Sequence, residues 1–142
     1  MPKQTVSKAK KKAWVAFSAY IRTRDCYLYA KRHPESNGLQ AECVTCGRLY
    51  PFGKLQAGHF ISGRSNAQLF DEIGVNVQCY GCNVMKKGAT DEYWVWMENN
   101  YGREEIDRLM AQKHETVKLT VQDYLNIESK YKDKKREIME RQ

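Results

Sequence analysis

Two cysteine pairs, CVTC at residues 43–46 and CYGC at residues 79–82, decide how the middle of this sequence folds. They supply four soft thiolates, and the gap of two residues lets both sulfurs of a pair reach one tetrahedral ion, as structural zinc prefers. Two redox dithiols would instead need a thioredoxin-like strand–helix context, which the sequence lacks. We therefore predict a structural Zn²⁺ whose four positions are filled, leaving none for water or substrate. Its ligands are Cys43, Cys46, Cys79 and Cys82.

The segment between the two pairs would be held at both ends by this zinc. It can fold with a thin core because metal binding contributes folding free energy directly. If the segment folds back as a hairpin, His59 on the first strand lies close to residues 75–78 on the second. The same hairpin would bring His59 near Asn83, at the start of the following helix.

Helical patterns flank the zinc-bound segment. Residues 1–11 are expected to be a disordered basic arm, followed by a single domain over residues 12–142. Within this domain we predict an N-terminal helix and loop at 12–38, a zinc-bound core at 39–89, and C-terminal helices with a basic tail at 90–142. Within the core we expect strand-like segments at 39–60, a loop at 61–75, a strand at 75–78 and a helix start at 82–87. After the core we expect three helices. The first is capped by Thr90 or Asp91 and ends near residue 100, the second covers 103–112, and the last is capped by Thr120.

Length and composition narrow the class of protein. At 142 residues the chain fits one domain without a second independent core. No apolar run approaches the roughly 20 residues that a membrane span needs, and the start lacks the apolar stretch of a signal peptide. We expect a cytoplasmic protein without membrane contact, whose cysteines stay reduced. Cys26, outside the pairs and inside a helical pattern, is expected to be a small buried apolar residue.

The charge of the chain is strongly basic. A net charge of +7 and a pI near 9.2 favour a polyanionic partner, such as nucleic acid, over a merely solvated basic surface. Lysines and arginines crowd residues 3–12 and residues 130–136. Such runs are often solvated tails, and they would also serve as phosphate contacts.

Three motifs resemble one known family when they are taken together. QAGHF at residues 56–60, FDE at 70–72 and QCYGCN at 78–83 look like the phage NinG (Rap) recombination endonucleases, within the broader HNH or ββα-metal nucleases. The resemblance implies an α+β fold, with a zinc-stabilised ββα-metal (HNH-like) core and flanking α-helices. It also implies a metal-dependent DNA endonuclease that hydrolyses phosphodiester bonds in branched recombination intermediates, such as Holliday junctions, in the cytoplasm of a bacterial host cell.

The resemblance assigns catalytic roles to three residues. His59 would be the general base that takes a proton from the attacking water, a task that suits a neutral imidazole. Asn83 would bind Mg²⁺ or Mn²⁺ through its amide oxygen. The asparagine of the HNH motif usually lies five residues before the third cysteine, where this chain has Gly74. Asn76 lies three residues before that cysteine. Either Asn76 takes the role of the HNH asparagine, or it braces the loop instead, or this chain has lost that role.

Two carboxylates near the motifs are candidates for the remaining ligands of the catalytic metal. Many HNH nucleases carry a metal-binding side chain just before the general base, and this chain has Gly58, as the NinG subgroup does. We nominate Asp71 and Glu72, for which solvated loop acids are the alternative. Candidate phosphate contacts are Arg64, Lys86 and Lys87, with plain surface solvation as the alternative. Symmetric cleavage of a junction would favour a homodimer, although the sequence pattern indicates no dimer interface. We assign no role to His114.

Two other classes of function remain open at this point. One is a non-catalytic, zinc-stabilised DNA-binding module, and the other is a zinc module that binds proteins. In both, His59 would be an ordinary hydrogen-bonded residue and Asn83 a helix N-cap. Cleavage of DNA, and its loss in a His59 variant, would separate the enzyme from both.

Overall fold

The structure is a computed structural model that describes residues 5–61 and 66–141 of the chain. It is a mixed α+β fold, as predicted, and it contains two small antiparallel hairpins. The elements in chain order are α1 (Val6–Arg32), β1 (Gln40–Glu42), β2 (Leu49–Pro51), the 3-10 turn η1 (Phe52–Lys54), β3 (Leu55–His59), α2 (Asn66–Leu69), β4 (Val75–Cys79), the π-helical turn η2 (Gly81–Met85), α3 (Thr90–Asn100), α4 (Arg103–Ala111) and α5 (Val121–Glu140).

Helix α1 is longer than the sequence pattern indicated. Thr5 caps it by accepting a hydrogen bond from the Lys8 N–H at 3.2 Å, and Ala9 is fully buried against Tyr124 of α5. The expectation of a disordered arm was therefore wrong for residues 6–11. The small alanine on the inner side allows close packing of α5, whereas the lysines that suggested disorder lie elsewhere around the helix. Residues 1–4 of the expected arm lie outside the described residues.

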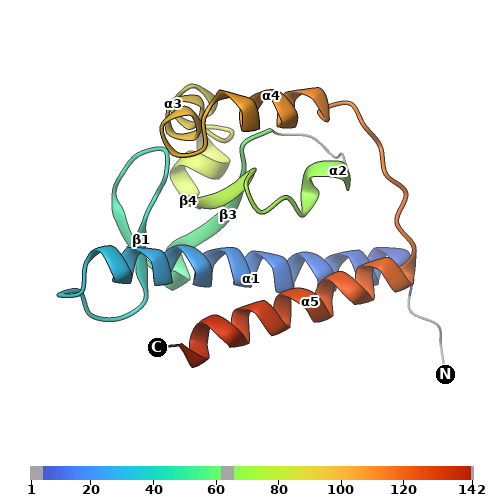
Figure 1. The fold of residues 1–142 in the computed structure, drawn as a ribbon, viewed down its shortest axis with the longest axis horizontal. Coiled ribbons are helices and arrows are strands. Elements are labelled where there is room, and N and C mark those ends of the chain that lie inside the picture. Colours follow the sequence, from blue (N-terminus) through green and yellow to red (C-terminus); the bar gives the residue numbers. More distant parts are fainter. Residues whose placement is uncertain (1–4, 62–65, 142) are drawn as a thin grey trace.

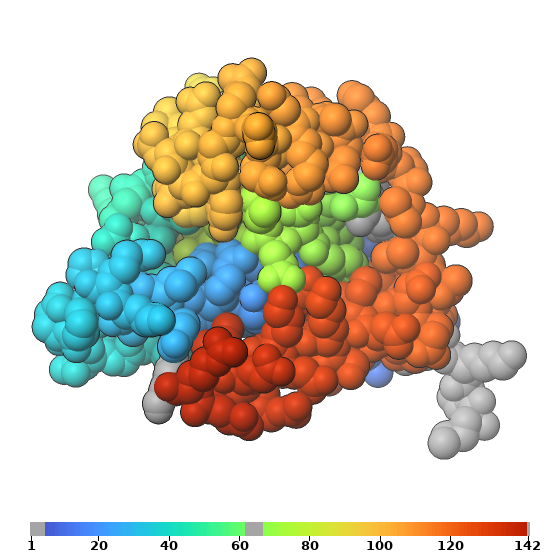
Figure 2. Space-filling view, in the orientation of Figure 1, coloured from blue at the N-terminus to red at the C-terminus, as the bar shows by residue number. Residues whose placement is uncertain are grey.

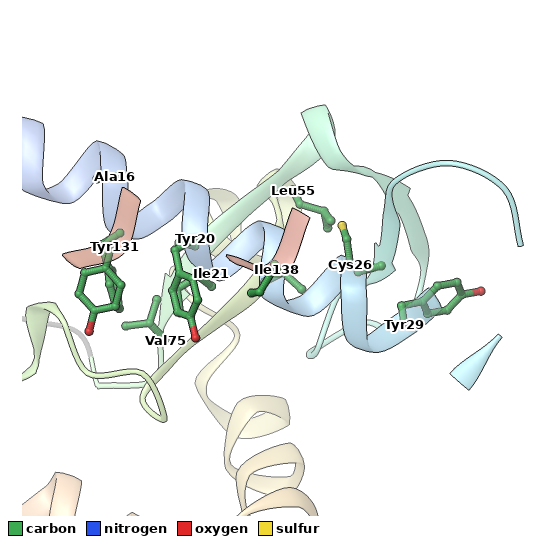
Figure 3. Close-up of a cluster of buried hydrophobic side chains, with 13 residues drawn as sticks. Ala16, Tyr20, Ile21, Cys26, Tyr29, Leu55, Val75, Tyr131 and Ile138 are labelled. Atoms are coloured by element: carbon green, nitrogen blue, oxygen red, sulfur yellow. The ribbon is translucent and has the colours of Figure 1, made fainter. Parts of the chain in front are cut away.

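Helices α1 and α5 lie side by side and run in the same direction (Figure 1). Tyr124 packs near the start of α1, and Tyr131 packs one to two turns further along, on Phe17 and Tyr20. The predicted cap of α5 is confirmed, because Thr120 and Asp123 form a reciprocal capping box. The pair forms one wall of the main core, which Figure 3 shows with its tyrosines and aliphatic side chains.

The hairpin of β3 and β4 lies against α1 and has two different faces. Its register pairs His59 with Val75 and Leu55 with Cys79. Because side chains alternate along a strand, every second residue projects to the same face of the hairpin. The face toward α1 is largely apolar and carries Leu55, Ala57, His59, Val75 and Val77. The opposite face carries Gln56, Gly58, Asn76 and Gln78.

A second layer covers the polar face of the hairpin. Helices α3 and α4 pack around Phe60, Tyr93 and Leu109, above the hairpin in Figures 1 and 2. Helix α3 starts at Thr90 with Ala89 at its cap, so the expected caps at Thr90 or Asp91 were wrong. A short helix, α2, lies in the segment expected to be a loop. No helix in the described part of the chain is long and apolar enough to span a membrane.

Candidate functional site

Four cysteine sulfurs converge between the two hairpins. Cys43 and Cys46 lie in the turn between β1 and β2, Cys79 ends β4, and Cys82 lies in η2. The four Sγ atoms lie within 4.8 Å of one another, and those of Cys46 and Cys79 are 3.9 Å apart. A tetrahedron with Zn–S bonds of about 2.3 Å has edges of about 3.8 Å. The cluster is therefore compatible with a zinc ion bound by four thiolates, as the cysteine spacing predicted.

The ionisation of the four cysteines also favours a bound cation. Burial raises the pKa of Cys43, but the Thr45 hydroxyl and nearby backbone N–H groups outweigh that effect and bring the pKa to about 6. Burial raises the pKa of Cys82 to about 12. Four adjacent thiols cannot all ionise because their charges repel, whereas a bound divalent ion would compensate that repulsion.

His59 ends β3 on the face that packs on α1. Its ring stacks on Trp14, with centroids 5.1 Å apart and planes at 18°. Nε2 lies 3.2 Å from the Leu69 carbonyl oxygen. Since a carbonyl only accepts, Nε2 carries the proton and Nδ1 keeps the lone pair of the neutral ring. Burial lowers the pKa of His59 below its ordinary value of 6.5, against the opposing effect of the Leu69 bond.

Asn83 approaches the hairpin from its other face. Its Nδ2 donates to Gln56 Oε1 at 2.7 Å. Gln56 and His59 are three residues apart on β3, so their side chains project to opposite faces. The predicted pairing of His59 with residue 75 is confirmed, but His59 and Asn83 do not share a face. The two-residue period of the strand separates them, which the zinc pinning alone could not reveal.

Gln78 fills the space beside Gly58, the residue directly before His59. A Cβ at position 58 would lie 1.8 Å from Gln78 Oε1, so only glycine fits there. Gln78 Nε2 donates to the Gly88 carbonyl at 2.9 Å and to Thr45 Oγ1 at 3.1 Å, which directs Oε1 toward Gly58. Within residues 5–61 and 66–141, Gln78 Oε1 is a buried oxygen without a hydrogen-bond partner. The sequence argument missed this residue.

Asn76 braces the hairpin against the second layer. Its Nδ2 donates to the Ile73 carbonyl at 2.9 Å and to the Tyr93 hydroxyl at 3.2 Å. Its Oδ1 accepts from Arg24 at 3.0 Å. With 1% of its surface exposed, Asn76 occupies the bracing position that the sequence left as an alternative to catalysis.

Asp71 and Glu72 are held in ion pairs at the other end of β4 from Asn83. Asp71 lies 2.8 Å from Arg108, and Glu72 lies 2.8 Å from Lys134. Burial would raise the pKa of both carboxyls, but these cations and other hydrogen bonds outweigh it and lower the pKa of each. Both acids precede β4 and Asn83 follows it, and five strand residues span about 13 Å. The structure therefore does not bring the nominated carboxylates to Asn83.

The candidate phosphate contacts are only partly placed. Lys86 and Lys87 are exposed at the end of η2, beside the zinc cluster. Arg64 lies outside the described residues. His114 is exposed after α4, and Cys26 is buried at 1% exposure, as predicted.

Three contacts that sequence reasoning missed hold the hairpin on α1. Trp14 stacks on His59, and Asp25 Oδ2 accepts from the Val77 backbone N–H at 3.1 Å. Arg24 donates to the Val75 carbonyl at 3.0 Å. The only available signal was the position of these residues within the first helical pattern, because their partners lie some 50 residues away.

Together the fold and the four sulfurs define a mixed α+β protein with a candidate structural zinc site. Comparison with known sequences gives the family. The family described as "Bacteriophage Lambda NinG protein" matches residues 3–141, and the chain belongs to this NinG family.

Three curated relatives are similar to the chain. Protein ninG of Escherichia phage 933W and protein ninG of Enterobacteria phage VT2-Sa are each 31% identical over 129 residues, covering 90% of this chain and 57% of the relative. Protein ninG of Enterobacteria phage H19B is 30% identical over 114 residues, covering 80% of this chain and 49% of that protein. The chain thus spans about half the length of the curated relatives it matches. No solved structure matches it.

Proposed function

We propose that this chain is a metal-dependent, structure-specific DNA endonuclease with an HNH-like core, acting on branched recombination intermediates such as Holliday junctions in the host cytoplasm. One observation carries the proposal. In a NinG-family chain, His59 is held neutral, with Nε2–H bonded to the Leu69 carbonyl and a lone pair on Nδ1. A neutral, oriented imidazole is what a general base requires at physiological pH.

The proposed chemistry begins at Nδ1 of His59. Nδ1 accepts a proton from a water molecule as the water oxygen forms a bond to phosphorus. The bond between phosphorus and the leaving oxygen of the DNA backbone then breaks, and that oxygen takes a proton from solvent water to become a hydroxyl group. The Leu69 carbonyl stabilises the imidazolium that forms, and the Trp14 ring keeps the imidazole in one orientation. This is acid–base catalysis by a positioned side chain.

A hard divalent ion, Mg²⁺ or Mn²⁺, completes the proposal. The oxygens on the polar face of the hairpin suit such an ion by type, since Asn83 offers an amide oxygen and Gln78 Oε1 lacks a hydrogen-bond partner among the described residues. When bound, the ion would stabilise charge on the phosphate. Because the donors are neutral, water and phosphate oxygens must supply much of its shell, so we expect weak binding without DNA.

The DNA contacts in this proposal are the exposed Lys86 and Lys87, together with Arg64, whose place is undescribed. Among the described residues β3 pairs with β4 alone, so the other edge of β3 carries no strand there, and both faces of the hairpin adjoin that edge. A phosphate lying across that edge would be approached by His59 from one face and by Asn83 from the other. Paired cuts in a four-way junction would be made by a homodimer.

One observation favours the non-catalytic alternative, a zinc-stabilised DNA-binding module. The two nominated carboxylates, Asp71 and Glu72, form ion pairs with Arg108 and Lys134 at the other end of β4 from Asn83. This alternative predicts binding of DNA without cleavage.

The test is cleavage of a labelled four-way junction with added Mg²⁺ or Mn²⁺, compared with a linear duplex. We expect nicked products from the wild type, and a loss of about 10²-fold or more in His59→Ala, the usual range for general-base removal. His114→Ala is the matched control because His114 is exposed after α4. Intact junctions with every metal, or full activity in His59→Ala, would contradict the proposal.

A further inference from the structure

Parallel packing of α1 and α5 brings together two basic runs that are far apart in the sequence. A groove of about 390 Å³ lies between the two helices. Its rim carries Lys11 and Lys12 from α1, and Lys132 and Lys135 from α5. Its floor is apolar, with Ala16 buried at 6% exposure, and the exposed Val15 lies beside it. Neither basic run alone would form this surface.

The charge on this groove is largely uncompensated. Glu128 is the acidic residue at its rim, and it pairs with Lys132 at 2.9 Å. The other three lysines make no ion pair with any residue in the described parts of the chain. Clustered like charges oppose folding, and a bound polyanion relieves this repulsion while releasing its own counterions.

The groove opens on a different side of α1 from His59. Trp14 marks the side that contacts His59. At about 100° per residue, Lys12, Ala16 and Ala19 of the groove lie roughly 140–160° around the helix from Trp14, whereas Val15 lies about 100° and Lys11 about 60° from it. A helix with its side chains is about 10–12 Å across. A DNA segment in the groove is therefore separated from the one at His59 by the body of α1.

We infer that this groove binds the phosphate backbone of a second DNA arm, beyond the arm that His59 would cleave. The inference rests on the proposed function and gives it a structural basis for preferring branched DNA over a plain duplex. Lysines on both rims would contact phosphates, and the apolar floor would face the sugars. A second copy of the chain is disfavoured as the occupant, because two lysine-rimmed grooves would repel each other.

The test measures DNA affinity without added Mg²⁺ or Mn²⁺, so that it does not depend on cleavage. The groove variant carries Lys11→Gln, Lys12→Gln, Lys132→Gln and Lys135→Gln. The control variant loses the same charge at exposed lysines that do not line the groove, namely Lys31→Gln, Lys54→Gln, Lys113→Gln and Lys118→Gln. Fluorescence anisotropy with a four-way junction and a linear duplex, each over a range of salt concentrations, gives the affinities.

We expect the groove variant to bind the junction about tenfold more weakly than the control does, the loss expected from a few phosphate contacts. Its slope of log affinity against log salt should fall by about one for each lost contact. Duplex affinity should match the control. Equal losses on junction and duplex, or no difference from the control, would overturn the inference, as would a change in sedimentation with DNA affinity intact.

Two further measurements keep this test separate from the proposed chemistry. Thermal unfolding should show a midpoint close to that of the wild type, because the substitutions remove repulsion among the lysines together with one partly exposed ion pair, Lys132–Glu128. If the quadruple variant does not fold, the pairs Lys11→Gln/Lys12→Gln and Lys132→Gln/Lys135→Gln are measured separately, and each should weaken junction binding. A chain that binds junctions through the groove but never cleaves would refute the endonuclease and retain this inference.

Discussion

His59 is the residue on which the proposed function depends, and its environment determines its tautomer and its pKa. It stacks on Trp14 and bonds through Nε2 to Leu69 O, which together set the tautomer and exclude water from one side of the ring. A surface histidine would titrate near 6.5, whereas burial lowers the pKa of His59. The unfolded chain then binds more protons than the folded one as the pH falls below about 6.5. The titration of His59 therefore leaves the free energy of unfolding unchanged above that pH and lowers it below that pH.

The first expectation concerns this titration. In the wild type, the pKa of His59 should lie below 6.5, and Nε2 should be the protonated nitrogen at pH 7. Trp14→Ala should raise the pKa toward 6.5 because it exposes the ring. Two-dimensional ¹H–¹⁵N NMR of the imidazole nitrogens measures both properties. A wild-type pKa above 6.5, or a protonated Nδ1, would contradict this account of the site.

The second expectation concerns Gly58 and Gln78. A methyl group at position 58 overlaps Gln78 Oε1, so Gly58→Ala should lower the free energy of unfolding by about 1–3 kcal/mol, the usual cost of overpacking. Gln78→Ala removes the obstacle but also loses the amide's hydrogen bonds. In a double-mutant cycle followed by urea unfolding, the double variant should lose less than the sum of the two single losses. Strict additivity would show that the two side chains do not compete for the space.

Residue spacing predicted the cysteine cluster but not the faces of the hairpin. The Cys-x-x-Cys gaps are local, so one tetrahedral site follows from them directly. Whether His59 and Asn83 share a face depends on strand register and on which elements cover each side, and those are long-range properties. The partners of Asp71 and Glu72 lie on α4 and α5, so their ion pairs were equally invisible.

At the scale of elements, the four sulfurs join the turn between β1 and β2 to the end of β4 and to η2. We expect the purified protein to carry about one zinc ion per chain, measured by elemental analysis. Cobalt substitution should give the absorption of a tetrahedral thiolate site. Cys46→Ser should lose metal and lower the thermal midpoint, whereas Cys26→Ala, the control at a buried cysteine outside the cluster, should keep it. Full metal content in Cys46→Ser would exclude the four-thiolate site.

Glu72, in the segment before β4, links that segment to α1 and α5, since it accepts hydrogen bonds from Tyr20 of α1 and from Tyr131 and Lys134 of α5. Its pKa is lowered in the fold, so this link stabilises above the ordinary value of 4.5 and is lost as the pH falls through the folded pKa. Glu72→Ala should cost about 1–2 kcal/mol at pH 7, mostly from the phenol bonds, because the partly exposed ion pair contributes little. Urea unfolding at pH 7 and pH 3 should show the difference shrinking at the lower pH. A constant difference would mean that the carboxylate charge does not matter.

At the scale of the whole molecule, α1 is the common support. One side of it carries the hairpin and His59, another carries α5, and the groove with its lysines lies between α1 and α5. The first and last helices of the sequence therefore close the core together. A pattern of apolar residues could predict both helices but not that they pack in parallel, because this depends on the path of the intervening chain.

Deletion of residues 121–142 tests this dependence directly. It uncovers the face of α1 that buries Tyr124, Tyr131 and Ile138, each worth roughly 1.5–3 kcal/mol when fully buried. We expect the shortened chain to lose its cooperative thermal transition and to bind the dye ANS, while it still retains zinc, whose ligands all lie between residues 43 and 82. Ser129→Ala, an exposed change in the same helix, should shift stability by no more than about 0.5 kcal/mol. An unchanged transition after the deletion would show that α1 and the hairpin form a self-sufficient core, and α5 would then serve the DNA-binding groove alone.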